Sequence, residues 1–266
     1  MRKSILNIGG MALTAILCSG IAASSVRAEE DKPTANLSVA ALSKYVWRGY
    51  EYSKDSIVLQ PSMTVAYKGF SMNLWGNLDT DHHETFATSD ADSSSWTETD
   101  LTLSYTLNTS LVDYGLGYIY YALDGFDDTQ EVYVSATLKT LLSPSLTIYR
   151  DYDFYPGWYI SAGVSHSLPI TDTLSLALGA KVGYYDIDDE ATLADPNDHH
   201  DAYSGFHDGS LSASMTFPVT DFLSVTPSIA YSFPLDSDAE DVIEALSANG
   251  KDSDFVYGGV TLSMSF

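Results

Sequence analysis

The sequence predicts an all-β protein: a transmembrane, antiparallel, up-and-down β-barrel of about 12 strands, preceded by a cleaved signal peptide. Three observations predict this fold. An apolar leader opens the chain, apolar and polar residues then alternate with a period of two, and the connections between the alternating runs include a short set and a long set. The last two features are typical of barrels whose outer face meets lipid and whose inner face meets water.

The first 28 residues have the pattern of a secretory signal peptide. Arg2 and Lys3 precede a mostly apolar run, and Val26-Arg27-Ala28 provides a cleavage site just before the first acidic residues. An uncleaved N-terminal membrane anchor is the alternative. We therefore expect a signal peptide over 1–28, a short periplasmic segment over 29–36 and a barrel over 37–266.

Twelve runs have the alternation expected of strands with one apolar and one polar face. In order along the chain, the predicted strands cover 37–48, 57–68, 70–79, 96–107, 111–123, 130–139, 145–153, 158–168, 173–186, 209–217, 222–233 and 254–266. Most have about 9–14 residues, which is enough to cross a bilayer when tilted. An even count is typical of bacterial single-chain barrels.

The connections differ in length from one end of the predicted barrel to the other. Every second connection is short, as at 108–110 and 169–172. The connections between them include three long loops, over 80–95, 187–208 and 234–253. Short turns are typically periplasmic and long loops extracellular, so both termini are expected on the periplasmic side.

A short helix is predicted inside the last long loop. Ser237 and Glu240 have the spacing of a capping box, and Gly250 is a plausible stop. Val242, Ile243 and Leu246 would share one face of this helix, which could lie over the barrel mouth.

Aromatic residues and the last run support a membrane location. Tyr45, Trp47 and Trp158 fall near predicted long-loop ends, and Phe70 falls near a short turn, as expected of two membrane interfaces. The final run ends at Phe266 and looks like the terminal strand that the barrel assembly machinery recognises. A soluble β-sandwich is the remaining alternative for the fold.

Short motifs in this chain resemble a known group. Leu42-Ser-Lys-Tyr-Val-Trp-Arg-Gly49, Gln60-Pro61 and Leu74-Trp-Gly-Asn77 resemble the opening strands of the TorF-type porin family. Ser143–Tyr149, Gly157–Tyr159 and Gly163–Pro169 resemble other outer-membrane β-barrels of the same group. The resemblance implies an outer-membrane barrel with a channel role, and it carries over no catalytic residue.

The charge of the chain excludes several classes of protein. Asp and Glu number 36 against 12 Lys and Arg, a formal net charge of −24, so no nucleic-acid partner is expected. The single cysteine, Cys18, lies in the leader, which excludes a disulfide scaffold. The acids gather in 79–100, 186–208 and 236–254, at the three long loops. We expect these loops to face outward and to bind divalent cations that bridge carboxylates and lipopolysaccharide phosphates.

Polar positions of the strands give the predicted lumen. The lumen and selectivity candidates are Lys44, Arg48, Gln60, Asn73, Asn77, Glu98, Asp100, Glu131, Asp151 and Asp153. They predict passive diffusion of small hydrophilic solutes through a Gram-negative outer membrane, with selection by charge. The acidic mouth loops predict a preference for cations. The alternative is that interior salt bridges close the lumen, which would give a non-conducting structural or surface-binding barrel. Arg150 breaks the alternation of its run, so a bulge or an outer-rim position is expected there.

Enzymatic and metal chemistry have weaker support. A barrel lipase would need a serine and a histidine at one rim, but His166 falls at the short-turn end. A barrel protease would need paired acids and a histidine, which the acidic loops supply only non-specifically. We therefore predict no enzyme and no cofactor. Candidate metal ligands are His82, His83, Asp195, His199, His200 and Asp201, with solvated acidic loops as the alternative.

Overall fold

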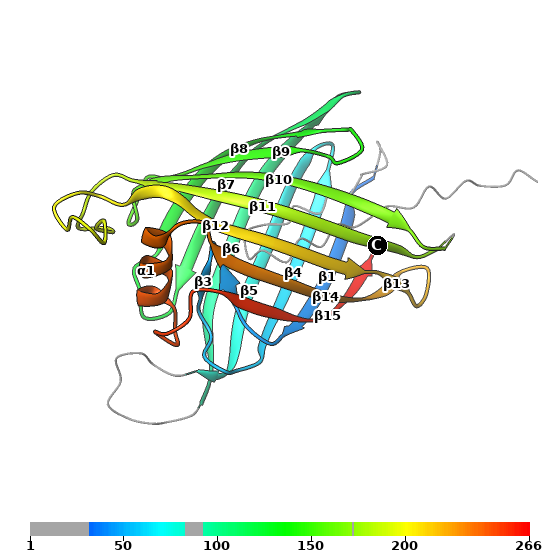
Figure 1. The fold of residues 1–266 in the computed structure, drawn as a ribbon. Helices are drawn as coiled ribbons and strands as arrows, with labels where there is room; N and C mark the ends of the chain where they lie inside the picture. The colour runs from blue at the N-terminus through cyan, green and yellow to red at the C-terminus, as the bar shows by residue number, and fades with distance from the viewer. Residues whose placement is uncertain (1–31, 83–92, 172) are drawn as a thin grey trace, which may run out of the picture.

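A computed structural model describes residues 32–82, 93–171 and 173–266, apart from the side chains of His82 and Ser93, and it confirms the predicted fold (Figure 1). Twelve antiparallel strands form a closed barrel. They are β1 (Thr34–Leu42), β4 (Val58–Tyr67), β5 (Phe70–His82), β6 (Ser93–Asn108), β7 (Val112–Leu123), β8 (Thr129–Leu138), β9 (Ser145–Asp151), β10 (Gly157–Pro169), β11 (Ser175–Ile187), β12 (Ser204–Met215), β14 (Leu223–Pro234) and β15 (Phe255–Ser265). The predicted signal peptide lies outside the described residues. In the described part of the chain, no helix is long and apolar enough to cross a membrane.

The barrel closes because its first and last strands pair. Leu37 of β1 lies opposite Met264 of β15, and every other barrel strand pairs with its sequence neighbours in the barrel. The short strand β13 (Phe217–Pro218) only extends the turn before β14. Both ends of the barrel domain, Thr34 and Ser265, therefore lie at the end that carries the short connections (Figure 1).

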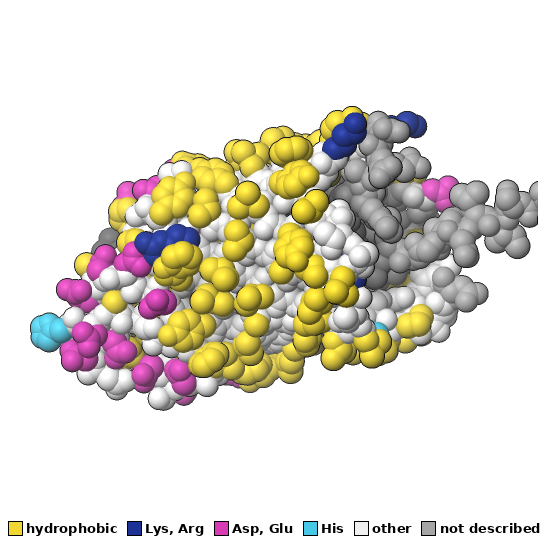
Figure 2. Space-filling view, turned by 90° about the horizontal axis from the view of Figure 1, so that it is seen from above, with side chains coloured by type: hydrophobic (Ala, Val, Ile, Leu, Met, Phe, Trp, Pro, Cys, Tyr) yellow, Lys and Arg dark blue, Asp and Glu magenta, His cyan; other side chains and the backbone are white. Residues whose placement is uncertain are grey.

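The alternation of the sequence places apolar side chains on the outside of the barrel. Figure 2 shows apolar side chains spread over the barrel wall and most acidic ones at the loop end. Exposed residues such as Val39, Leu74, Leu116 and Val134 belong to this outer face. Its extent is unusual for a surface in water and suits contact with lipid.

Arg150 lies on the outer face at the loop end, so its side chain keeps the alternation of β9. The guanidinium donates to Asp188 Oδ1 at 2.7 Å and lies over the ring of Trp158. The neighbouring carboxylate makes a basic residue tolerable at this outer-rim position.

The first predicted strand, 37–48, was too long. Strand β1 ends at Leu42, and residues 43–57, here called the inward segment, turn into the barrel and carry a small hairpin of β2 (Val46–Trp47) and β3 (Tyr50–Glu51). The chain can reverse there because Arg48 and Gly49 have positive φ angles of 47° and 91°. Tyr45 and Trp47 therefore belong to the interior and not to the aromatic rim.

Helix α1 (Ser237–Leu246) forms where the loop pattern predicted it, but its boundaries differ. Asp236 is the N-cap and accepts from the Ala239 N–H at 2.8 Å, in place of the predicted capping box at Ser237. The helix ends before Ser247 and does not reach Gly250. Its buried side chains include Val242 and Ile243.

Candidate functional site

The inward segment crosses the interior and contacts several walls of the barrel. Tyr45 donates its hydroxyl to Glu98 on β6 at 2.7 Å. The Tyr50 ring lies 5.0 Å from the His207 ring on β12. Arg48 reaches β8. These contacts lie on different sides of the barrel, so the segment narrows the lumen at this level.

Arg48 occupies a pocket that we call the Arg48 cage, made of one carboxylate and four aromatic rings. Its NH1 and NH2 groups donate to the two oxygens of Glu131, both at 2.7 Å. The guanidinium carbon lies 4.2 to 5.8 Å from the centroids of the aromatic rings of the cage: Trp47, Tyr149, Tyr159 and Tyr185. Arg48 is 7% exposed, so the ion pair is screened little by water.

The inward segment is fastened to the chain that follows α1. Glu51 pairs with Lys44 through its side chain, and its backbone N–H donates to the Ser247 hydroxyl at 3.1 Å. The amide of Asn249 donates to the other oxygen of Glu51 at 2.6 Å. The hairpin and the loop after α1 therefore form one unit at the loop end of the barrel.

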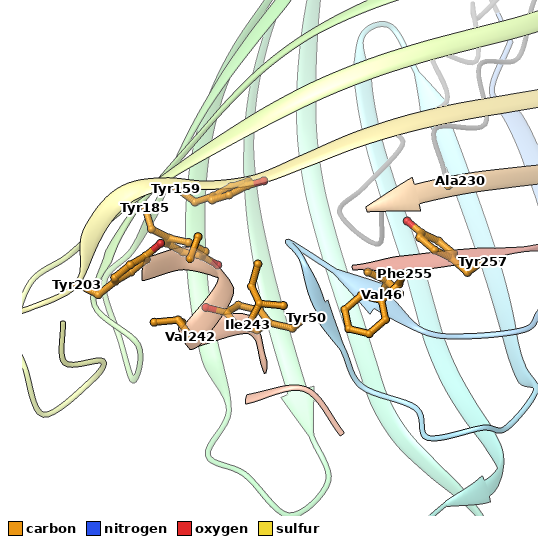
Figure 3. Close-up of a cluster of buried hydrophobic side chains, with 11 residues drawn as sticks. Val46, Tyr50, Tyr159, Tyr185, Tyr203, Ala230, Val242, Ile243, Phe255 and Tyr257 are labelled. Carbon is orange, nitrogen blue, oxygen red and sulfur yellow. The ribbon is translucent and has the colours of Figure 1, made fainter. Parts of the chain in front are cut away.

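An apolar cluster holds α1 against the inward segment. Figure 3 shows Tyr50, Val242 and Ile243 in this cluster, with Tyr159 and Tyr185 on the barrel wall. Ile243 is fully buried. Helix α1 thus covers part of the barrel mouth, as its predicted position suggested.

Acids outnumber bases among the buried residues of the described part of the chain. The buried acids are Glu51, Asp79, Glu98, Asp100, Glu131, Asp151 and Asp208, whereas Arg48 is the one buried Arg or Lys. The described residues provide ion-pair partners for three of these acids, through Lys44–Glu51, Arg48–Glu131 and Lys181–Asp208. The interior therefore carries an excess of carboxyl groups.

The structure places nine of the ten lumen candidates inside the barrel. Lys44 and Arg48 are there because of the inward segment and not, as predicted, on the first strand. Gln60 Nε2 donates to Asn77 Oδ1 at 3.0 Å, and Asn73 donates to hydroxyls on β4. Glu98, Asp100, Glu131 and Asp151 are buried, as given above. Asp153 is exposed, in the connection after β9, where it accepts from Gln130 at 2.7 Å.

Several residues of the site were missed by the pattern analysis. Tyr159, Lys181, Tyr185 and Asp208 all point inward from β10, β11 and β12. The inward parity of Lys181 and Asp208 was a signal that could have found them, since a charge on a lipid-facing position is costly.

The described residues contain no group of three or more His, Cys, Asp or Glu side chains that could hold a metal ion. Asp195 instead accepts backbone N–H groups of Asn197 and Asp198, at 2.8 and 3.2 Å, and so closes a turn. His199, His200 and Asp201 are exposed in the same loop. The side chain of His82 and all of His83 lie outside the described residues.

His166 is on the barrel face at the short-turn end, where its Nδ1 lies 2.7 Å from the Leu141 carbonyl. This contact fastens a turn. Its neighbours Ser165 and Ser167 on β10 lie on the opposite face of the strand from His166, because successive side chains of a strand alternate between its two faces.

Asp188, outside the strands, pairs with the guanidinium of Arg150. The hydrogen bond from Arg150 lowers the pKa of Asp188, which follows directly after β11. This carboxylate therefore stays charged to more acidic pH than an ordinary aspartate.

The chain was compared with protein families, with curated protein sequences and with solved structures, and only solved structures are similar to it. No family model and no curated protein sequence matches the chain. Among solved structures, the COG4313 outer membrane channel of Pseudomonas putida F1 is similar with a TM-score of 0.49 and 10% identity, covering 88% of this chain and 95% of that one. The Pseudomonas putida toluene transporter TodX is similar with a TM-score of 0.36 and 10% identity, covering 88% of this chain and 89% of that one. An anion-selective porin from Comamonas acidovorans has the same TM-score and identity, covering 88% of this chain and 99% of that one. The resemblance to TorF-type porins remains a prediction.

Proposed function

We propose that this protein is an outer-membrane channel for passive diffusion of small hydrophilic solutes, with a preference for cations. One observation carries the proposal: among the described residues, a closed barrel with an apolar outer face encloses seven buried acids, and only three of them pair with Lys44, Arg48 or Lys181. A charged interior in a lipid-facing barrel favours solutes of the opposite sign. The inward segment acts as the constriction.

The gathering of acids at one end of the barrel supports an orientation of the barrel in the outer membrane. The acidic loop end would face outward beside lipopolysaccharide, with divalent cations between loop carboxylates and lipid phosphates. The short turns and both termini would lie in the periplasm. Strand β15, which is followed by Phe266, would be the part that the barrel assembly machinery recognises during insertion.

Conductance of the purified protein in planar lipid bilayers tests the proposal. We expect discrete conductance steps and, under a salt gradient, a reversal potential of the sign given by cation preference. Asp208→Asn should reduce that preference because Asp208 is buried in the interior and pairs with Lys181 as a carboxylate, whereas the exposed control Asp153→Asn should change it far less. Absence of steps, or anion preference, would contradict the proposal.

A second candidate is a non-conducting barrel with a structural or surface-binding role. It is favoured by the cluster of Tyr50, Val242 and Ile243, which packs the inward segment against α1 at the barrel mouth. Replacing residues 44–56 by a Gly/Ser linker separates the two candidates. A wild-type barrel that never conducts, beside a linker variant that does, would support the sealed barrel.

A further inference from the structure

We propose that the Arg48 cage is a binding site for solutes that carry a guanidinium or alkylammonium group, and that Arg48 is an internal occupant which such solutes displace. The proposal rests on the channel function proposed above and names a solute class for it. The structure already holds one guanidinium group in this pocket, at 2.7 Å from both oxygens of Glu131.

Most of the pocket belongs to the barrel wall and not to the inward segment. Tyr149, Tyr159 and Tyr185 lie directly opposite one another on β9, β10 and β11. Their ring centroids are 6.0 and 4.8 Å apart. Glu131 comes from β8, the next strand along the barrel. The backbone hydrogen bonds of four adjacent strands therefore fix the positions of four of the five residues that form the cage.

Hydrogen bonds that do not involve Arg48 orient these side chains. Tyr159 donates its hydroxyl to Asp208 at 2.7 Å, and Lys181 donates to the same hydroxyl at 3.0 Å. Tyr121 donates to Glu131 Oε2 at 2.9 Å. The ring and the carboxylate would thus keep their orientation if Arg48 left.

The chemistry of the pocket selects the occupant. Aromatic faces attract cations, most strongly where water is excluded. A carboxylate with both oxygens aimed inward matches the paired donors of a planar guanidinium, and an ammonium group matches it less well. An anion would be repelled by Glu131. The pocket therefore suits organic cations more than sodium or potassium, which cannot use the rings as well once hydrated.

The internal occupant can leave without breaking the barrel. Arg48 is on the inward segment, outside the sheet of twelve strands, and its own φ of 47° is unfavourable for a residue with a side chain. Its departure would leave the buried Glu131 without a cation, which is costly until another cation arrives. A solute cation that replaces the guanidinium removes this cost.

Binding of methylguanidinium to Arg48→Ala in detergent tests the proposal directly. Methylguanidinium is the end of an arginine side chain, and the titration follows Trp47 fluorescence and the thermal midpoint at constant ionic strength. We expect the variant to bind at least about tenfold more tightly than wild type, because the competing occupant is gone. In Arg48→Ala/Glu131→Gln this binding should disappear. Arg48→Gln, a longer neutral side chain, serves for the same titration should Arg48→Ala not fold.

Arg150→Ala is a matched control. Arg150 also pairs with a carboxylate and lies over one ring, at 5.1 Å from Trp158, but its site is on the outer face and has no surrounding cage. Methylguanidinium should not bind there. Equal affinity for wild type, Arg48→Ala and Arg150→Ala would overturn the proposal.

The binding titration does not depend on conductance, so the two proposals fail separately. Binding to Arg48→Ala in a barrel that never conducts would refute the channel function and leave the cation site. Conductance without methylguanidinium binding to either Arg48 variant would refute the cation site and leave the channel.

Discussion

A Cβ atom added at Gly49 of the inward segment would lie 2.9 Å from Cδ1 of Ile243 on α1. The two residues are far apart in sequence, yet their packing leaves no room for a side chain at residue 49. Gly49 also has a φ of 91°, which residues with a side chain rarely adopt. The turn of the inward segment and the helix over the barrel mouth therefore depend on one another.

Gly49→Ala should destabilise the protein for both reasons. We expect the free energy of unfolding to fall by about 2 kcal/mol or more, since the backbone conformation and the overpacking each have a cost. Thermal unfolding in detergent, followed by circular dichroism, measures the change.

Gly125→Ala is the control for backbone conformation alone. Gly125 has a φ of 80°, but a Cβ atom there would meet nothing within 4 Å. Its loss of stability should be clearly smaller than that of Gly49→Ala. Equal losses would mean that the contact with Ile243 is unimportant.

Ile243→Ala should loosen α1 from the inward segment. Ile243 is fully buried, so truncation leaves a cavity that costs about 2–5 kcal/mol. Leu246→Ala on the same helix should change stability by less than about 0.5 kcal/mol, because Leu246 is 52% exposed. Single-channel recording adds a second measurement: if α1 covers the route of the solute, only Ile243→Ala should increase conductance or its fluctuations.

Period-two alternation was sufficient to predict the barrel. It found all twelve barrel strands, because each has one face in contact with lipid and one with the interior. It could not find where β1 ends, since Tyr45 and Trp47 continue the alternation beyond Leu42 while the backbone turns inward. The strand ends at Leu42 because the inward segment leaves the sheet there, and tertiary contacts such as the hydrogen bond from Tyr45 to Glu98 hold that segment in the interior.

The candidate site was predicted in its parts but not in its connections. The inward acids follow from strand parity, whereas the pairing of Arg48 with Glu131 depends on the path of the inward segment. The pattern also could not show which side chains of α1 become buried, because this depends on tertiary contacts. Helical spacing placed Leu246 on one face with Val242 and Ile243, but in the structure Val242 and Ile243 join the cluster with Tyr50 whereas Leu246 is exposed.

Glu131→Gln should have a large effect on stability. The substitution leaves the buried Arg48 guanidinium without its counter-charge, and breaking a buried ion pair costs about 3–5 kcal/mol. Asp113→Asn removes the carboxylate of a partly exposed pair with Lys139 and should cost no more than about 1 kcal/mol. Chemical unfolding of both variants in the same detergent compares them. Similar losses would show that the Arg48–Glu131 pair is not shielded from water.

The Arg150–Asp188 pair on the outer rim predicts a dependence of stability on pH. The hydrogen bond from Arg150 lowers the pKa of Asp188, so the folded state binds the proton less readily than the unfolded state. The stabilisation is therefore complete above the ordinary Asp pKa of about 4 and is lost as the pH falls through the lowered value. Because both side chains are partly exposed, the pair should contribute no more than about 1 kcal/mol. Wild type should exceed Asp188→Asn in thermal midpoint at pH 7, and the difference should vanish near pH 2. Asp221→Asn, in an exposed short turn, should have the same thermal midpoint as wild type at pH 7. A difference between wild type and Asp188→Asn that persists unchanged at low pH would mean that the ion pair is not its source.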